Sequence, residues 1–401
     1  MQIPILSGIT TDSAGDFRTS YPANMIPVPK AQGISPGYLR PAEGMISTSQ
    51  GPGICRGAIE WNGALYAVMG SKLVVVAADG TTTTLGDVGG AGRVSLDHSF
   101  DYLAIASSGD LWLYDGTTLA QNTDPDLGTG LDVFWANGYF LTTDGEFIVS
   151  LELDDPFSVE PIKYGASEAD PDPVIGLQRL RNEVYALNQN TIEVFGVIAS
   201  TGFPFQRITG AQIQKGCVGT HASAEFMDAL AFVGGGDGDA TAVWIGGGGR
   251  TTKISTREID QILEDTSAFD LSITHVESRS HKNHTNLYIH LPKQTLVYDA
   301  AASSALERPV WYTLHSGTSE PENWRVSDMV WLYNQWNVFD TQTAATGVLT
   351  SEVSTHWGDV VSWEFSTIIL WNQTSGAIVH DLELTALTGR VVGSPTIGTQ
   401  F

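Results

Sequence analysis

The sequence predicts an all-β chain folded as a β-propeller, and two observations carry this prediction. Pairs of apolar runs, each pair split by a glycine or polar turn, recur along the chain. Runs rich in β-branched and aromatic residues with turn residues between them are typical of β-hairpins. Their spacing is the second observation. Leu65 to Leu103 is 38 residues and Phe140 to Val184 is 44, close to the roughly 40–50 residues of a propeller blade.

Seven hairpins can be named, so we expect seven blades, with six as the alternative because the last pattern is the least regular. Their ranges are 64–76, 102–115, 139–151, 184–195, 230–245, 287–299 and 329–348. The turns contain residues that favour tight-turn geometry, as in Gly70-Ser71, Ser108-Gly109-Asp110 and Asp144-Gly145.

The two ends of the chain differ from the repeated part. Residues 1–50 lack a sustained period and contain several prolines, which remove a backbone donor and fix φ. These prolines are Pro22, Pro27, Pro29, Pro36 and Pro41. We therefore expect an extended N-terminal arm at 1–50, with an apolar strip at Met25–Pro29 suited to a partner surface. The propeller follows at 51–350, and renewed alternation at 357–371 and 380–384 predicts the start of a C-terminal β domain at 351–401.

One helix is expected inside the β pattern. Ser255-Thr256-Arg257-Glu258 matches a capping box, and Ile259, Ile262 and Leu263 follow on one face. The preceding Gly246-Gly247-Gly248-Gly249 indicates a hinge or tight turn. It lacks the order of a phosphate-binding loop, so we expect no phosphate site there.

Charge excludes proteins that bind nucleic acid through basic clusters. The 401 residues contain 20 Lys and Arg against 45 Asp and Glu, for a net charge of −25. Lys163 is the one basic residue between 101 and 175. Solubility accounts for such acidity as well as a surface that repels DNA does, and both explanations stay open.

Cysteine content and hydropathy indicate a protein made in a reducing cytosol. Cys55 and Cys217 are too few and too distant for a disulfide framework, so we expect two buried thiols. The sequence from Met1 to Leu6 lacks the pattern of a signal peptide, and no apolar run approaches the roughly 20 residues of a membrane span.

No metal site or cofactor is expected. His275, His281, His284 and His290 are the best candidate ligands, but they span a loop and a strand without a carboxylate pair. Three acidic loops lack the offsets of calcium loops and are better explained as turns. They are Asp124-Pro125-Asp126, Asp170-Pro171-Asp172 and Asp237-Gly238-Asp239.

Catalysis is not expected either, although some propellers are glycosidases. Ser107 to Trp112 resembles only in part the S-x-D-x-G-x-T-W motif that is repeated in sialidases. The sequence also lacks the G-x-S-x-G motif that positions a serine nucleophile. Four arginines could contribute to a triad for a sugar carboxylate, but the sequence does not assemble them. They are Arg93, Arg179, Arg181 and Arg207. A glycan-binding or glycan-degrading propeller is kept as the alternative function.

Several short segments, in order along most of the chain, resemble one protein family. They are Asn24-Met25 with Pro29-Lys30, Gly37-Tyr38-Leu39-Arg40, Gly92-Arg93-Val94-Ser95 with His98, Thr191-Ile192-Glu193-Val194-Phe195, Gln214-Lys215-Gly216 with Gly219-Thr220, and Ile289 to Lys293 through Leu296 to Ala300. The chain is similar to the packaged DNA stabilisation proteins, or tail hub (nozzle) proteins, of short-tailed bacteriophages.

This resemblance implies a structural virion protein and not an enzyme. It implies a homo-oligomeric ring, expected to be a hexamer, below the portal and its adaptor (the head-to-tail connector). The ring would continue the DNA channel without sequence-specific binding, retain the packaged genome until ejection, and anchor a needle or plug and tailspikes or fibres. The protein would be made in the host cytoplasm without membrane insertion. Relatives continue past the point that matches Phe401, with further β structure and a basic segment.

Overall fold

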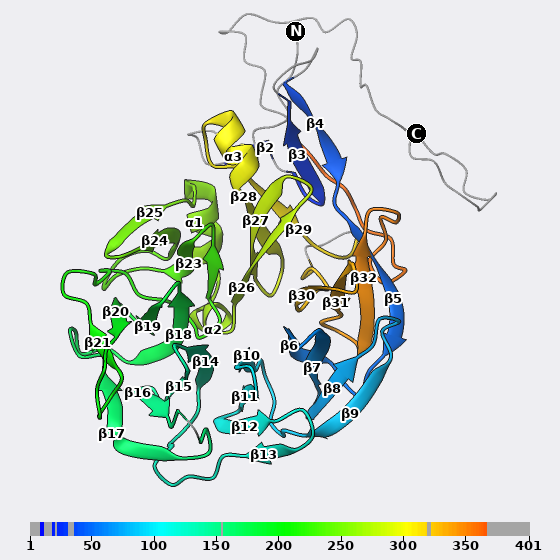
Figure 1. Cartoon of the computed structure of the whole chain (residues 1–401). Coiled ribbons are helices and arrows are strands. Elements are labelled where there is room, and N and C mark those ends of the chain that lie inside the picture. The colour runs from blue at the N-terminus through cyan, green and yellow to red at the C-terminus, as the bar shows by residue number, and fades with distance from the viewer. Residues whose placement is uncertain are drawn as a thin grey trace, which may run out of the picture. The chain divides into compact units, whose positions relative to one another are not determined.

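The computed structural model describes residues 9–11, 18–20, 22–30, 36–153, 155–318 and 322–366. Within these residues, seven four-stranded antiparallel sheets follow one another around a common axis, as the blades of a propeller (Figure 1). The first strands of neighbouring blades lie side by side at six junctions, and at the seventh the Met329 N–H of β30 donates to Glu277 of β26. The prediction of a seven-bladed propeller is confirmed.

Each blade is a meander of consecutive strands except the last. Blade 1 is β6 (Cys55–Trp61), β7 (Ala64–Met69), β8 (Lys72–Val76) and β9 (Thr82–Asp87). Blade 2 is β10 (Ser95–His98), β11 (Leu103–Ser107), β12 (Asp110–Tyr114) and β13 (Leu119–Gln121). Blade 3 is β14 (Asp132–Ala136), β15 (Tyr139–Thr143), β16 (Phe147–Leu151) and β17 (Val159–Ala166). Blade 4 is β18 (Val174–Leu180), β19 (Glu183–Asn188), β20 (Ile192–Val197) and β21 (Phe205–Arg207).

The remaining blades complete the ring of sheets. Blade 5 is β22 (Ser223–Phe226), β23 (Ala229–Gly234), β24 (Ala242–Gly247) and β25 (Arg250–Lys253). Blade 6 is β26 (His275–His281), β27 (His284–His290), β28 (Thr295–Asp299) and β29 (Trp311–Leu314). Blade 7 is β30 (Met329–Leu332), β31 (Gln335–Phe339), β32 (Ala345–Thr350) and β5 (Gly44–Gln50).

The seven hairpins expected from the sequence each lie in one of the seven blades. In blades 1 to 6 they are the second and third strands, and in blade 7 they are β30 to β32. Turns between the first two strands of a blade often have two consecutive residues at positive φ, such as Asn62 and Gly63 at 50° and 76°. Two positive φ values are the type I′ geometry that matches the twist of paired strands. Local sequence therefore determines each hairpin.

Strand β5 closes the propeller, and here the structure differs from the expected arm at 1–50. Gly44–Gln50 pairs with β32, with Ile46 opposite Val348 and Met45 opposite Leu349. Met45 is fully buried in the core of blade 7. The sequence pattern missed this strand because β5 has no hairpin partner nearby in the chain. Its partner lies about 300 residues away in sequence.

The residues before β5 also form β structure where they are described. β1 (Thr10–Thr11) pairs with β2 (Arg18–Ser20), and β3 (Met25–Pro29) pairs with β4 (Gly37–Pro41). Pro27 and Pro29 fit because residues two apart in a strand direct their nitrogens to the same, unpaired edge. Ile26 from the predicted apolar strip is 7% exposed and packs into the core of blades 6 and 7. This part of the strip lies against the propeller itself.

Asn24 holds the N-terminal segment against two other parts of the chain. It is 1% exposed and has φ of 54°. Its amide donates to the carbonyls of His315 at 2.9 Å and Ser362 at 2.8 Å, and its oxygen accepts from the His315 N–H at 3.0 Å. Asparagine tolerates this left-handed conformation better than most residues. Three hydrogen bonds therefore join residues 22–24, the end of β29 and residues 362–364.

Three helices lie among the described residues, all between blade strands. α1 (Arg257–Glu264) confirms the predicted helix and buries Ile259 and Leu263. The predicted capping box is wrong, because Thr256 is the N-cap and its side chain makes no capping hydrogen bond. Ser255 instead bonds to Asp260 and to the Val243 N–H. α2 (Ala268–Ser272) and α3 (Ala300–Leu306) are shorter.

The core lies mostly between neighbouring blades. Trp61, Val68 and Leu73 of blade 1 pack against Leu103 and Ile105 of blade 2, all at most 3% exposed. Each such large side chain stabilises the fold by about 1.5–3 kcal/mol through burial. Because every blade shares its apolar faces with two neighbours, closure by β5 also completes the core.

The described part of the C-terminal segment, residues 351–366, runs along the propeller. His356 forms a bridge with Met45, and the Trp357 indole donates to the Arg325 carbonyl at 2.7 Å. The described part of the alternation predicted at 357–371, residues 357–366, forms isolated bridges and no strand. The rest of it and the segment 380–384 lie outside the described residues. In the described ranges, no helix combines the length and apolar character needed to cross a membrane.

Candidate functional site

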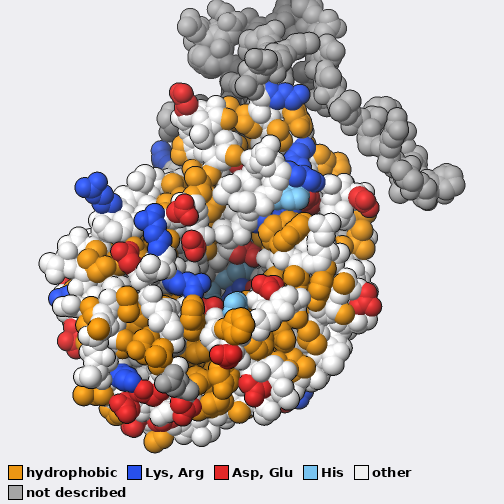
Figure 2. Space-filling model, in the orientation of Figure 1, with side chains coloured by type: hydrophobic (Ala, Val, Ile, Leu, Met, Phe, Trp, Pro, Cys, Tyr) orange, Lys and Arg blue, Asp and Glu red, His pale blue; other side chains and the backbone are white. Residues whose placement is uncertain are grey.

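A cavity lies in the central channel of the propeller. It has a volume of about 320 Å³ and is lined by side chains from the first strands of six blades and from the loops before them. Figure 2 shows this hollow, with basic, acidic and histidine side chains gathered around it. A channel lined by charged groups differs from the apolar pockets that bind most small ligands.

An ion pair spans the wall of the channel. The Arg93 guanidinium lies 2.5 Å from an Asp328 carboxylate oxygen, and it also donates to the Ser327 carbonyl at 3.3 Å. Arg93 precedes blade 2 and Asp328 precedes blade 7, so the pair bridges across blade 1. Burial raises the pKa of Asp328, and the neighbouring Arg93 opposes that rise. This arginine is therefore held by a partner within the fold.

Carboxylates of the inner strands tie neighbouring blades together at three junctions. Asp97 accepts a hydrogen bond from the Trp135 N–H at 2.6 Å, and Asp132 accepts one from the Leu177 N–H at 2.8 Å. Glu277 accepts one from the Met329 N–H at 3.0 Å in the same way. These bonds join blades 2 to 3, 3 to 4 and 6 to 7. Much of the acidity at the axis therefore has a structural use.

Two of these carboxyl groups have shifted acidities. Burial raises the pKa of Asp132 to about 6, against the opposing effect of hydrogen bonds from the Leu177 and Val133 N–H groups. Burial also raises the pKa of Asp97. His221 also lines the channel. Burial disfavours its charged imidazolium form and so lowers its pKa to about 3.

The structure brings together two of the four candidate histidines. His275 and His290 lie opposite each other on β26 and β27, with parallel rings whose centroids are 4.0 Å apart. Glu277, which sequence reasoning missed, lies beside both. Side chains alternate between the two faces of a strand, so residues 275 and 277 lie on the same face of β26. A strand assumed at this position would therefore have placed Glu277 beside His275.

The other two histidines have separate partners. His281 lies 3.2 Å from the Glu43 carboxylate, and His284 contacts the buried Asp299 carboxylate. They face each other at the turn end of the same strand pair. The four histidines therefore do not form one site.

Of the four arginines weighed for a sugar-binding triad, Arg93 and Arg179 line the channel cavity, whereas Arg181 and Arg207 do not. Arg93 pairs with Asp328, and Arg179 donates to the Trp135 carbonyl at 2.7 Å. Arg181 donates to the Asp228 carbonyl at 3.5 Å, and Arg207 pairs with Glu193 on the outer part of blade 4. Two arginines at one cavity, each with a partner inside the fold, do not make the triad that a substrate carboxylate would need.

The acidic loops, glycine run and cysteines have local explanations. Asp124, Asp172 and Asp239 each accept hydrogen bonds from their own or a neighbouring loop. Gly248 and Gly249, both at positive φ, form the tight turn between β24 and β25. Both cysteines are free and buried, and burial raises the pKa of Cys217 to about 12.

Comparison with solved structures finds other chains of similar fold. The N-terminal domain of Nup159 is 8% identical with a TM-score of 0.46, covering 83% of this chain and 99% of that one. BBS1N, in a complex with ARL6DN, is 10% identical with a TM-score of 0.47, covering 78% and 99%. The extracellular domain of BT4673 from B. thetaiotaomicron is 10% identical with a TM-score of 0.48, covering 77% and 40%. None of these identities bears on function.

Sequence comparison is more specific. The tail hub protein gp10 of Salmonella phage P22 is 29% identical over 412 residues, covering 97% of this chain and 84% of that relative. A family model described as bacteriophage P22 Gp10, beta-propeller, matches residues 1–354. That match includes all seven blades and the closing strand β5. The chain therefore belongs to the bacteriophage P22 Gp10 β-propeller family.

Proposed function

We propose that copies of this chain assemble into a hexameric ring below the portal and its adaptor, where the ring continues the DNA channel. In this role the ring retains the packaged genome and anchors a needle or plug and tailspikes or fibres. The observation that carries the proposal is the family match over residues 1–354. Membership of this family makes the chain a structural tail hub protein and a component of the virion.

A closed propeller has the mechanical properties that a ring subunit needs. β5 completes blade 7, and inner carboxylates join neighbouring blades, so the subunit resists deformation. A ring requires one side of each copy to bind a different side of the next copy. Seven distinct blades offer such different sides. We propose a structural and not a catalytic role. A glycan-degrading propeller is not favoured, since its candidate arginines are each held by separate partners.

Blades 2 and 3 are suited to face passing DNA. Asp110, Glu146 and Glu160 are exposed there, and Lys163 is paired with Glu152. This pairing neutralises the single basic residue of the 101–175 segment. Contacts between basic residues and phosphates would hold DNA in a salt-dependent way that ejection must overcome. We therefore propose that this segment faces the channel of the assembled ring and lets DNA slide without sequence-specific binding.

The proposed organisation keeps an N-terminal arm at 1–50, a propeller at 51–350 and a C-terminal β region at 351–401. The arm contributes its last residues, Gly44–Gln50, to blade 7. We propose that the chain is made in the host cytoplasm and enters the tail without membrane insertion.

Purified chain, alone and mixed with the portal adaptor protein, tests the ring. Native mass spectrometry and negative-stain electron microscopy are expected to show hexamers, and rings on the tail axis when adaptor-bearing particles are added. Persistent monomers that never join the tail axis, or densities only around the tail periphery, would overturn the proposal.

A charge-matched pair of triple variants tests the DNA-facing segment. Asp110→Asn, Glu146→Gln and Glu160→Gln remove three exposed carboxylates from blades 2 and 3, whereas Asp237→Asn, Glu264→Gln and Glu352→Gln remove three elsewhere. DNA release from assembled virions should become slower and more salt-dependent in the first variant only. Equal DNA release from both variants would show that the 101–175 segment does not face the DNA. That result would not contradict the proposed ring.

A further inference from the structure

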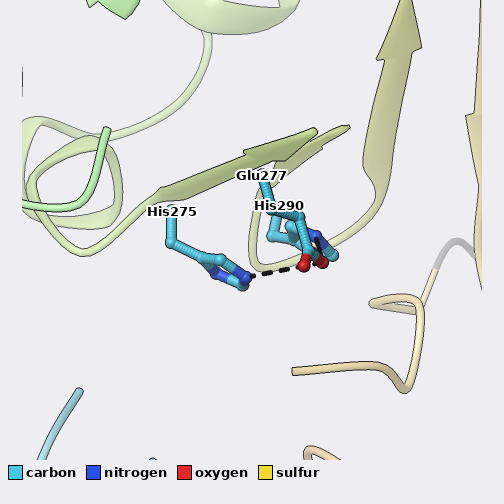
Figure 3. Close-up of side chains that lie close together, drawn as sticks. All are labelled: His275, Glu277 and His290. Atoms are coloured by element: carbon cyan, nitrogen blue, oxygen red, sulfur yellow. Dashed lines mark hydrogen bonds and ion pairs between the residues drawn. The ribbon is translucent and has the colours of Figure 1, made fainter. Parts of the chain in front are cut away.

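Three potential metal ligands converge on blade 6 at its junction with blade 7, and one of them, His275, borders the channel cavity. Figure 3 shows His275 and Glu277 on β26 and His290 on β27, with their side chains directed together. Glu277 Oε1 lies 2.8 Å from His290 Nε2 and 4.0 Å from His275 Nε2. One donor atom from each residue lies within 4.8 Å of the other two.

His275 has a buried nitrogen without a hydrogen-bond partner. The residue is 8% exposed, and its Nε2 has no partner among the described residues. This nitrogen is directed toward the Glu277 carboxylate but lies beyond hydrogen-bond distance from it. An unpaired buried polar atom costs about 1–3 kcal/mol. A cation between the two groups would satisfy it.

The remaining polar atoms of the cluster are already held by the protein. Glu277 Oε2 accepts from the Met329 N–H at 3.0 Å, and His290 Nδ1 lies 3.3 Å from the Thr295 hydroxyl. The main chain of Ser327 also interacts with the His275 ring. Metal-binding histidines commonly donate their second ring nitrogen to such a partner, which orients the ring. The Thr295 hydroxyl can donate or accept, so it serves either tautomer of His290.

The local charge favours a cation. Arg93 is the nearby positive group, and it is paired with Asp328 at 2.5 Å. Since Glu277 adds a second carboxylate, the three charged groups sum to one negative charge, with both histidines neutral. Asp328 therefore neutralises the positive charge of the Arg93 guanidinium before an ion binds.

The distances fit a small divalent ion after modest movement. With metal–ligand distances of about 2.1 Å, ligand atoms in a tetrahedral site lie about 3.4 Å apart. The gap of Glu277 Oε1 to His290 Nε2 must widen by about 0.6 Å, and its gap to His275 Nε2 must narrow by about the same amount. The parallel rings must also rotate so that both nitrogens face the ion. His275 borders the channel cavity, which supplies room for this rotation.

We propose that His275, Glu277 and His290 bind one divalent transition-metal ion of the zinc type, with water in the remaining coordination positions. Two imidazoles and one carboxylate suit Zn²⁺ and its neighbours in the first transition row, whereas Mg²⁺ and Ca²⁺ prefer oxygen ligands. On binding, His290 changes tautomer: its proton leaves Nε2, where the metal binds, and Nδ1 carries the proton and donates a hydrogen bond to the Thr295 hydroxyl. The sequence expectation of no metal site rested on histidines alone and lacked Glu277.

The ion would strengthen the junction between blades 6 and 7. Glu277 binds the first strand of blade 7 through Met329, so a metal held by Glu277 and both strands of the blade 6 hairpin restrains that junction. A ligand that binds only the folded state raises its stability. At 100 times the dissociation constant we expect the unfolding midpoint to rise by roughly 3 °C for a chain of this size.

Titration of untagged, chelator-treated full-length protein with Co²⁺, and displacement by Zn²⁺, tests the proposal. We expect one equivalent of Co²⁺ per chain, visible in its d–d absorption, and loss of at least tenfold in affinity in His275→Gln and in His290→Gln. His281→Gln is the matched control, because it removes a histidine from the same hairpin outside the cluster. Its affinity should equal that of the unaltered chain.

A second measurement on the unaltered chain guards against variants that fail to fold. Zinc X-ray absorption should show two imidazole nitrogens and one carboxylate oxygen at about 2.0–2.2 Å. Absence of saturable Co²⁺ or Zn²⁺ binding would overturn the proposal. So would equal affinity in all three variants, or a zinc shell without imidazole.

Discussion

Substitution of Asp132 tests the view that channel carboxylates are structural ties held at an energetic cost. Asp132 is 6% exposed, and its two oxygens accept the Val133 and Leu177 N–H groups at 2.9 and 2.8 Å. Burial raises the pKa of its carboxyl group to about 6, against an ordinary value of about 3.9. That difference corresponds to about 3 kcal/mol of free energy.

The sign follows from which state holds the proton. Between about pH 4 and pH 6, the folded chain keeps Asp132 protonated while the unfolded chain has released the proton. Unfolding therefore releases a proton in this window, and stability falls as the pH rises. At pH 7 the contribution of this group is about 3 kcal/mol less favourable than at pH 4.

Asp132→Asn removes the titration but also sacrifices a hydrogen bond, because the amide nitrogen cannot accept one. We expect the variant to be less stable than the unaltered chain at pH 4 by about 1–3 kcal/mol. Toward pH 7, the difference between the two chains should move in favour of the variant by about 3 kcal/mol, so that the deficit disappears. The pH-dependent part of the difference isolates the carboxyl group from the lost hydrogen bond.

Guanidinium unfolding, followed by tryptophan fluorescence at four pH values from 4 to 7, measures this difference. In thermal unfolding the same change should appear as roughly 4 °C. Asp110→Asn, at an exposed position of β12, is the control and should show no comparable change. A difference that stays constant within about 1 kcal/mol across the range, or moves the other way, would refute the reasoning.

Three further predictions concern stability. Arg93→Met should lower the unfolding free energy by about 3–5 kcal/mol in denaturant unfolding, because Asp328 stays buried and unpaired. Adding Asp328→Asn should restore part of that loss. No restoration would show that the pair does not act as a unit. Met45→Asp places a charge at a fully buried position of β5, so protease cleavage of the variant should be faster than that of the unaltered chain. Ser47 lies on the same strand but is exposed, so Ser47→Asp should leave the cleavage rate unchanged. Asn24→Ala should lower the unfolding free energy by about 3 kcal/mol through lost hydrogen bonds and backbone strain, and Asn24→Gly, which keeps the positive φ without the hydrogen bonds, should cost less. Equal costs for the two Asn24 variants would remove strain from the explanation.

The sequence by itself determined the blades. Each hairpin is encoded locally, by alternating apolar residues and by turn residues such as Gly70, which has positive φ in the turn between β7 and β8. Local patterns also identified α1, the glycine turn before β25 and the buried cysteines. These features need only neighbouring residues, so periodicity is sufficient to find them. The ordered segments shared with one phage family carried the functional prediction.

The tertiary structure alone decided how the ends meet and which polar groups share a site. β5 pairs with β32 in blade 7, although almost the whole propeller lies between them in the sequence. No local period of apolar residues can indicate such a distant partner. Glu277 joins His275 and His290 only when β26 and β27 adopt their register, and it reaches Met329 only when blade 7 is in place. Register between distant strands depends on burial of whole faces. That is why the sequence located the blades of this propeller but not its closure, its inner ties or its cluster of potential metal ligands.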